Sequence, residues 1–126
     1  MDIFTADPDG SDLRQITTAR GYDAEAGFSP DGKKIVFSST RSAYADNLTK
    51  EEKKLREIEL SYFGEIYIMT TDGSDQIRLT KSPGYDGGPF FSPDGQRIVW
   101  RRFNEAGAVA EIHTMKLDGS DVQQLT

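Results

Sequence analysis

The sequence predicts an all-β fold built from repeated blades of four antiparallel strands, and three observations lead to this prediction. A stretch of 17 residues that begins at Gly21 recurs at Gly84, with Gly-Tyr-Asp, Phe-Ser-Pro-Asp-Gly and Ile-Val-aromatic in common. Asp-Gly-Ser-Asp occurs at 9–12, 72–75 and 118–121. Each of these tetrapeptides lies between two short segments of strand-like composition. Without an insertion in one copy the unit has about 46 residues, which is typical of the blades of a β-propeller.

The strands follow from the alternation of residues and from the turn chemistry between them. We name the four strands of a blade a to d, from the innermost outward. The sequence predicts strand a at 24–29 and 89–92, strand b at 34–39 and 97–103, strand c at 3–6, 65–70 and 111–116, and strand d at 12–17, 75–80 and 121–126. Ser-Pro-Asp-Gly then forms the turn from a to b and Asp-Gly the turn from c to d, because proline presets φ and glycine accepts a positive φ.

These strands predict about two and a half blades. The expected parts are a half blade at 1–17, a blade at 24–80 with a helical insertion at about 42–63, and a blade at 89–126. So few blades cannot close a ring, and open blade edges invite pairing with another chain. We therefore expect either further blades or self-association.

The insertion predicts a helix. Thr49 and Glu52 have the spacing of a capping box. Two pairs of opposite charge stand at i and i+4, and an apolar stripe runs beside them. The pairs are Glu52–Arg56 and Lys53–Glu57, and the stripe is Leu55, Ile58 and Tyr62. The sequence favours a solvated helix whose stripe rests on the propeller, with a partner-binding helix as the alternative.

Composition argues against several classes of partner. A net charge of -6 and a pI near 4.7 oppose binding to nucleic acid, which needs a basic face, and docking on anionic lipid. The absence of cysteine excludes disulfides and thiolate chemistry. We also expect no membrane insertion, since no apolar run approaches the length of a bilayer, and no signal peptide is visible in this chain.

Both repeated motifs recur in phase, as in GYDGGPFFSPDGQRIVW and EIHTMKLDGSDVQQLT. This pattern resembles the WD-like propeller repeat of the TolB-like proteins over nearly the whole chain except the insertion. The resemblance implies a six-bladed propeller in the periplasm, or otherwise outside the cytoplasm, that binds protein partners in the Tol-Pal system of the bacterial cell envelope. Related blades also form propellers of prolyl-oligopeptidase-like hydrolases. The alternative role is therefore to gate substrate access for a catalytic domain outside this chain.

Function is expected on the face that carries the long loops. The a–b and c–d turns share one face of a blade, while the other face receives the insertion and the Gly-Tyr-Asp loops. The candidate channel-rim residues on the loop-rich face are Tyr22, Asp23, Glu25, Tyr85 and Asp86. They predict a rim of carboxylates and tyrosines that receives a protein or peptide. The alternative interpretation is structural, with each aspartate tying its loop to nearby backbone and each tyrosine packing between blades.

No catalytic residue is predicted. His113 is the only histidine, and it occupies the strand position that Tyr67 fills in the preceding copy, so we interpret it as a packing residue. The nucleophile elbow, the phosphate-binding loop and the dinucleotide fingerprint are all absent. The sequence therefore favours a non-catalytic protein without a cofactor.

Two groups of aspartates suggest a metal site. The aspartates in Asp-Pro-Asp-Gly-Ser-Asp at 7–12 miss the spacing of an EF-hand loop and fit a hairpin turn better. A divalent cation held in the channel by Asp23, Asp86 and their counterparts in further blades stays an alternative. A propeller enzyme with acidic metal ligands would use such a site.

Overall fold

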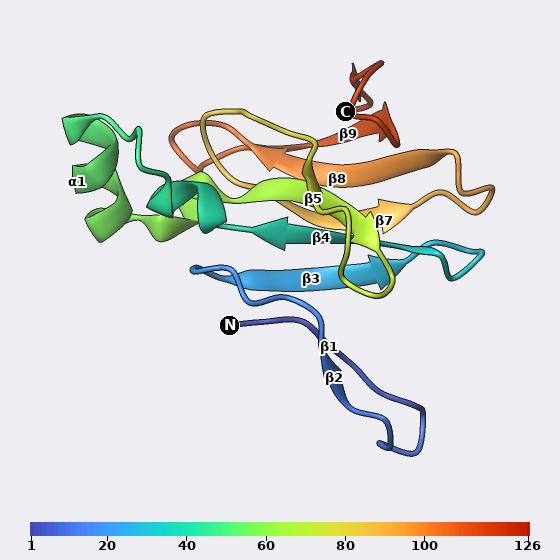
Figure 1. The fold of residues 1–126 in the computed structure, drawn as a ribbon. Coiled ribbons are helices and arrows are strands. Elements are labelled where there is room, and N and C mark those ends of the chain that lie inside the picture. Colours follow the sequence, from blue (N-terminus) through green and yellow to red (C-terminus); the bar gives the residue numbers. More distant parts are fainter.

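The computed structural model describes residues 1–126, and its strands form three antiparallel sheets (Figure 1). Two sheets have four strands in simple sequential order, and the third has two. This architecture confirms the predicted fold class of about two and a half propeller blades with one helical insertion.

The strand bounds are as follows. The half blade consists of β1 (Phe4–Thr5) and β2 (Arg14–Gln15). The middle blade consists of β3 (Asp23–Phe28), β4 (Lys34–Ser39), β5 (Glu65–Thr70) and β6 (Ile77–Arg78). The last blade consists of β7 (Asp86–Phe91), β8 (Arg97–Phe103), β9 (Ala110–Lys116) and β10 (Gln123–Gln124). The innermost strands, β3 and β7, lie side by side.

The Ser-Pro-Asp-Gly turns have one geometry in both complete blades. In the first, the hydroxyl of Ser29 donates to the Asp31 carboxylate at 2.6 Å, and the backbone N–H of Lys33 donates to the same oxygen at 3.0 Å. Gly32 has a φ of 71°, and Gly95 has a φ of 70° at the equivalent position. A left-handed φ strains any residue with a Cβ, which explains glycine at this place in the turn.

The hydrophobic core lies between the sheets. Because side chains alternate across a strand, β4 sends Val36 toward the last blade and Ile35 and Phe37 toward the half blade. One layer consists of Val36, Ile66, Ile68, Ile98, Trp100 and Met115. The other layer consists of Ile3, Ile35, Phe37, Tyr67 and Met69. Each apolar layer therefore joins two neighbouring blades.

The insertion contains α1 (Lys50–Ile58) between two short 3-10 helices, η1 (Arg41–Tyr44) and η2 (Leu60–Phe63). The predicted capping box is present, with Thr49 and Glu52 bonded in both directions. The predicted i,i+4 ion pairs do not form, since Glu52 is used in the cap and Arg56 binds Glu57 and the carbonyl of Ala43 instead.

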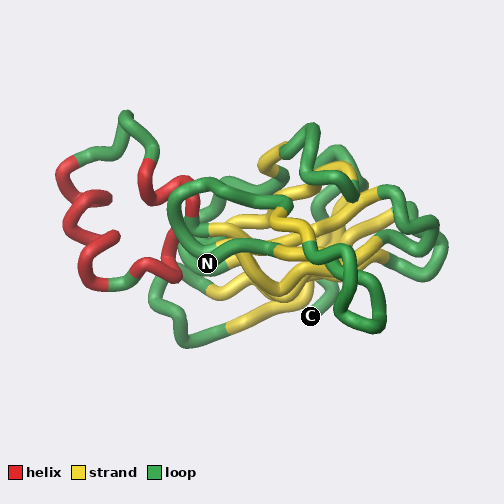
Figure 2. The backbone as a smooth tube through the Cα atoms, turned by 60° about the horizontal axis from the view of Figure 1, so that its bottom comes forward, coloured by secondary structure: helices red, strands yellow, loops and turns green.

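The helix stands away from the sheets (Figure 2). None of its residues is buried, and Ile58 of the predicted apolar stripe is 81% exposed. The helices of this chain do not reach the length and apolar character that crossing a membrane requires.

The two ends of the blades differ. Figure 1 shows the helical insertion at the end where β4 passes to β5, while the turns between β3 and β4 and between β7 and β8 lie at the opposite end. We call the first the loop-rich end and the second the turn end. The candidate rim residues Asp23 and Asp86 begin β3 and β7 at the loop-rich end.

Candidate functional site

The two rim aspartates are buried in ion pairs. The Asp23 carboxylate accepts hydrogen bonds from the Ser39 hydroxyl at 2.5 Å and from Nη2 of Arg41 at 2.8 Å. Asp86 accepts from Nε and Nη2 of Arg102 at 2.9 and 2.7 Å. Both carboxylates are fully buried, so each is neutralised inside the protein.

The arginine partners come from different positions of the repeat. Arg102 lies directly opposite Asp86 in the register of β7 and β8, but Ser39 lies opposite Asp23. Arg41 of η1 supplies the charge in the middle blade instead. The guanidinium groups also cover aromatic rings, with Arg41 4.8 Å from the Tyr67 centroid and Arg102 5.3 Å from the Trp100 centroid.

The aspartates also connect each blade to the preceding one. The backbone N–H of Asp23 donates to the carbonyl of Met1, and that of Asp86 to the carbonyl of Gly64, each at 2.9 Å. These equivalent bonds anchor the beginning of strand a to the strand c of its neighbour. Asp23 and Asp86 thus stabilise the contact between neighbouring blades. A role for them in binding a partner stays a prediction.

Two other predicted rim residues, Glu25 and Tyr85, meet across a blade boundary. The Tyr85 hydroxyl and the Gly88 backbone N–H donate to Oε2 of Glu25 at 2.5 and 2.7 Å. Arg101 adds a contact of 3.3 Å to the other oxygen. Burial, followed by the hydrogen bond to Glu25, raises the pKa of Tyr85, so the phenol stays protonated and acts as a donor.

Glu25 takes an unusual backbone conformation to make this contact. It has a φ of 54°, and a bulge between Ala24 and Gly27 shifts the register of β3 and β4. Gly88 fills the equivalent position in β7 with a φ of 61°. A left-handed non-glycine residue is rare, and here it directs a carboxylate into the next blade.

Tyr22 differs from Tyr85. The residue is 38% exposed, and its backbone exchanges hydrogen bonds with Thr40, each at 3.0 Å. The structure therefore brings Glu25 and Tyr85 together, buries Asp23 and Asp86 separately, and leaves Tyr22 at the surface.

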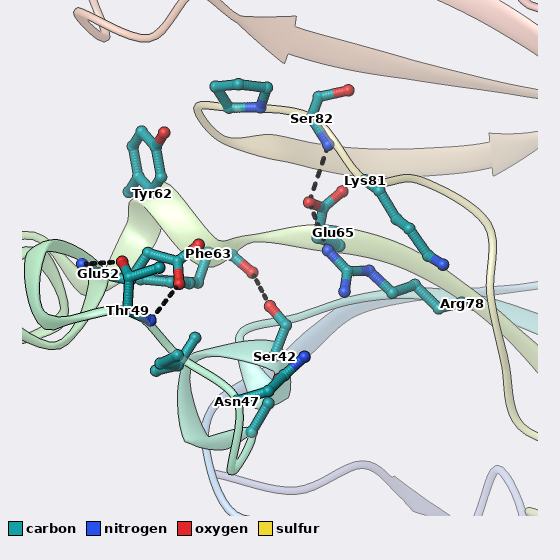
Figure 3. A pocket seen from close by; sticks show the side chains of 13 residues that line it. Ser42, Asn47, Thr49, Glu52, Tyr62, Phe63, Glu65, Arg78, Lys81 and Ser82 are labelled. Carbon is teal, nitrogen blue, oxygen red and sulfur yellow. Dashed lines mark hydrogen bonds and ion pairs between the residues drawn. The ribbon is translucent and has the colours of Figure 1, made fainter.

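A groove of about 460 Å³ lies between the helical insertion and the edge of the middle blade (Figure 3). Its lining mixes charged, hydroxyl and aromatic side chains from the insertion, from β5 and β6, and from the segment that follows β6. The labelled residues are Ser42, Asn47, Thr49, Glu52, Tyr62, Phe63, Glu65, Arg78, Lys81 and Ser82. In the last blade the corresponding connection spans only residues 104–109, so the insertion creates the groove.

Glu65 forms the floor of the groove together with its donors. Its carboxylate accepts from Nη2 of Arg78 at 2.9 Å and from the backbone N–H of Ser82 at 3.0 Å (Figure 3). It also accepts from the Thr80 hydroxyl at 2.5 Å. Burial raises the pKa of Glu65 despite these donors. Glu65 and Arg78 fix the segment after β6, which carries the exposed Lys81 to the groove.

The sequence prediction missed this groove, although one signal lay in the repeat. Each strand d ends in threonine, and its hydroxyl accepts a backbone bond from strand c. The pairs are Ile3–Thr17 and Ile66–Thr80 at 2.9 Å and Ile112–Thr126 at 2.8 Å. Thr80 and Thr126 also donate to Glu65 and Glu111. The recurring acid at the start of strand c could have indicated the network.

The other residues considered for catalysis or metal binding, His113 and the aspartates at 7–12, make contacts that stabilise the fold. His113 is 8% exposed and packs on Trp100 with ring centroids 5.5 Å apart. All three aspartates of the motif at 7–12 belong to the β1–β2 hairpin turn or its flank, where Asp9 accepts from Ser11 and Asp12 pairs with Arg14. No three acidic or histidine side chains converge where they could hold a metal ion.

Several known proteins are similar in sequence to this chain. No family model matches the chain. The Tol-Pal system protein TolB of Bordetella pertussis is 33% identical over an alignment that covers 95% of this chain and 33% of that protein. A TolB homolog of Chlorobium luteolum is 31% identical, covering 79% of this chain and 28% of the relative. The chain spans about a third or less of the length of these curated relatives.

Solved structures show the same fold. A TolB structure from Agrobacterium tumefaciens superposes with a TM-score of 0.76 and 24% identity, over 99% of this chain and 40% of that one. TolB from Acinetobacter baumannii gives 0.69 and 22%, over 98% and 26%. The fold and its repeats define a segment of a β-propeller. It is a propeller segment of the TolB-like family.

Proposed function

We propose that this chain is part of a non-catalytic β-propeller platform that binds a protein or peptide partner at its loop-rich end. The proposal rests on the difference between the two ends of the blades. The turn end has only tight turns whose polar groups bond one another, and the hollow of about 740 Å³ at that end is lined by these turns and the short strands beside them. The loop-rich end has the long insertion, which builds the groove of about 460 Å³. Binding residues concentrate on long loops that a rigid scaffold positions.

The lining of the groove suits a polypeptide. Tyr62 provides a half-buried aromatic ring, which packs edge to face on the buried Phe63 with centroids 5.5 Å apart. Lys81 and Asn47 offer an exposed cation and an amide beside them. A peptide segment has apolar side chains, backbone acceptors and carboxylates to satisfy all three kinds of group.

The relatives support the setting of this function. One is named a Tol-Pal system protein, so we propose that the partner is a protein of the bacterial cell envelope and that the chain works outside the cytoplasm, in the periplasm. The proposal assigns no chemical step to the chain. A longer propeller that contains this segment would present the same loop-rich end.

Site-specific photo-crosslinking in living bacteria tests the proposal. A photoreactive amino acid replaces Lys81 in the groove, Tyr22 at the predicted rim, or Gln96 in a turn at the opposite end. We expect a discrete crosslinked protein from position 81 and not from position 96. Crosslinking from position 22 alone would move the site to the rim, and equal products from positions 81 and 96 would contradict the proposal.

A further inference from the structure

A second pocket, of about 330 Å³, lies at the loop-rich end between the insertion and the connection from β8 to β9 (Figure 1). Its lining comes from residues between 59 and 62, from residues 84 and 85, and from residues 103–107, so all of it belongs to the two complete blades. Glu59 and Glu105 are its charged residues, and no lysine, arginine or histidine lines it. We call it the acidic pocket.

Three half-buried aromatic side chains, Tyr62, Tyr85 and Phe103, also line the acidic pocket. The rings of Tyr85 and Phe103 pack with centroids 5.7 Å apart and an interplanar angle of 48°. Gly84 lets the two segments approach, because a Cβ there would lie 2.6 Å from the Phe103 carbonyl oxygen. The face of an aromatic ring carries negative charge density, so a pocket with three rings favours a cation.

Neither carboxylate of the acidic pocket has a counter-charge. Glu59 accepts a hydrogen bond from the Ser61 hydroxyl, and Glu105 accepts one from the Tyr62 hydroxyl at 3.4 Å. Neither of them forms an ion pair. Burial, followed by the charge of Glu105, raises the pKa of Tyr62, as a negative potential at this ring requires. The pocket therefore has a negative charge that the chain does not neutralise.

Short turns hold both acids in place. The side-chain carbonyl of Asn104 accepts hydrogen bonds from the backbone N–H groups of Ala108 and Val109 at 2.9 and 3.3 Å. On the opposite side the backbone N–H of Tyr62 donates to the carbonyl of Glu59 at 3.2 Å. The lining is thus ordered before a ligand arrives, which lowers the cost of binding.

We propose that the acidic pocket receives a basic side chain, lysine or arginine, of the polypeptide that binds at the loop-rich end. This inference rests on the proposed function and names the chemistry of the partner. Tyr62 lines both the groove of about 460 Å³ and the acidic pocket, so one extended peptide can reach both.

A basic side chain satisfies both kinds of group in the acidic pocket. Its apolar stem and its charge pack on aromatic rings, and its N–H groups donate to carboxylates. A metal ion suits the pocket less well, because Glu59 and Glu105 are not joined by a third acid or a histidine. An organic cation is therefore the ligand that uses the rings as well as the acids.

Titration with short peptides, followed by NMR, tests the pocket in the 126-residue chain. The probes are acetyl-Gly-Arg-Gly-amide, the same peptide with lysine, and the same peptide with citrulline, a neutral isostere of arginine. We expect the backbone amides of Glu105 and Gly107 to shift and saturate with a Kd of about 1 mM for the two basic peptides. The citrulline peptide should give no saturable shift. Equal shifts with citrulline and arginine would overturn the proposal.

Matched variants separate the pocket from the net charge of the chain. Glu59→Gln combined with Glu105→Gln should weaken binding of the arginine peptide about tenfold. Glu51→Gln combined with Glu57→Gln removes the same charge from exposed positions of α1 outside the acidic pocket, and should change the Kd less than about twofold. Tyr62→Leu removes an aromatic face and should weaken binding about threefold. Equal losses in the two double variants, or unchanged binding in Tyr62→Leu, would contradict the proposal.

Crosslinking distinguishes a failure of this inference from a failure of the proposed function. Position 81 lines the groove and lies outside the acidic pocket. We expect the Glu59→Gln and Glu105→Gln pair to reduce the crosslinked product from position 81 several-fold. Undiminished product would overturn this inference and leave the proposed function intact. No product from position 81 in the otherwise unchanged chain would count against the proposed function, and the peptide titration would still decide whether the pocket binds a basic side chain.

Discussion

Glu25 and Tyr85 lie 60 residues apart in the sequence and connect two neighbouring blades through a hydrogen bond of 2.5 Å. We expect Glu25→Ala and Tyr85→Phe each to lower the free energy of unfolding, and the two effects to overlap by about 1 kcal/mol, because either change removes the same bond. Urea unfolding of both single variants and of the double variant measures this coupling. Tyr22→Phe is the control, since Tyr22 is 38% exposed. Additive effects would contradict the bridge.

The buried pair of Asp86 and Arg102 should matter more than an exposed pair. Asp86→Asn leaves the guanidinium of Arg102 without its counter-charge in a largely buried place, so we expect a loss of about 3 kcal/mol in the free energy of unfolding. Asp12→Asn disrupts the exposed pair with Arg14 and should cost less than about 0.5 kcal/mol. Chemical denaturation of both variants decides the comparison. Similar losses would show that Asp86 has no special structural role.

Substitution of the turn glycine Gly32 tests the cost of backbone strain separately from that of a steric clash. Gly32 has a φ of 71°, and a Cβ there would have no atom within 4 Å, so Gly32→Val adds strain without a clash. We expect a loss of about 1–2 kcal/mol from the left-handed conformation. Gly27→Ala is the control, because Gly27 lacks a positive φ and a Cβ there would have its nearest contact at 3.8 Å. Equal melting temperatures for the two variants would refute the argument from φ.

Glu65 predicts a pH dependence of stability. Burial raises its pKa above the ordinary 4.5, so the folded protein holds the proton more tightly than the unfolded chain. The stabilisation from protonated Glu65 is therefore complete below the unfolded pKa and is lost as the pH rises through the higher folded value. We expect the stability of the wild type relative to Glu65→Gln to decrease as the pH rises from about 4 to 7.

Urea unfolding of both proteins across this range measures the Glu65 effect. Hydrogen bonds from serine lower the pKa values of the turn aspartates Asp31 and Asp94. These aspartates make stability rise with pH, but they are present in both proteins. Their contribution cancels in the difference. A difference that stays constant or grows with pH would contradict the assignment to Glu65.

Local patterns predicted much of the fold. β4 and β8 have the predicted bounds, because alternating apolar residues and a strong turn before each strand fix both their period and their beginning. The capping box located the start of α1. β7 begins at Asp86 and not at residue 89, since Gly87 and Gly88 form a bulge in which Gly88 has a φ of 61°. Paired glycines look like a loop in sequence but permit a bent strand.

The site was harder to predict, because its partners occupy unequal positions of the repeat. The sequence placed Asp23 and Asp86 at equivalent positions, but their arginines, Arg41 and Arg102, come from a 3-10 helix in one blade and a strand in the other. The groove likewise depends on where the insertion lies relative to Glu65. Tertiary placement, and not local propensity, decides both features.

The two apolar layers have a consequence for how the molecule comes apart. Each layer is shared only by adjacent sheets, so the free energy of the chain is close to a sum of three unit terms and two coupling terms between nearest neighbours. The middle sheet takes part in both couplings, and each outer sheet takes part in one. Fraying should therefore start at both ends, and the amides of β4 and β5 should exchange last. Every further unit added to such a stack would raise the cooperativity of the whole by one more coupling.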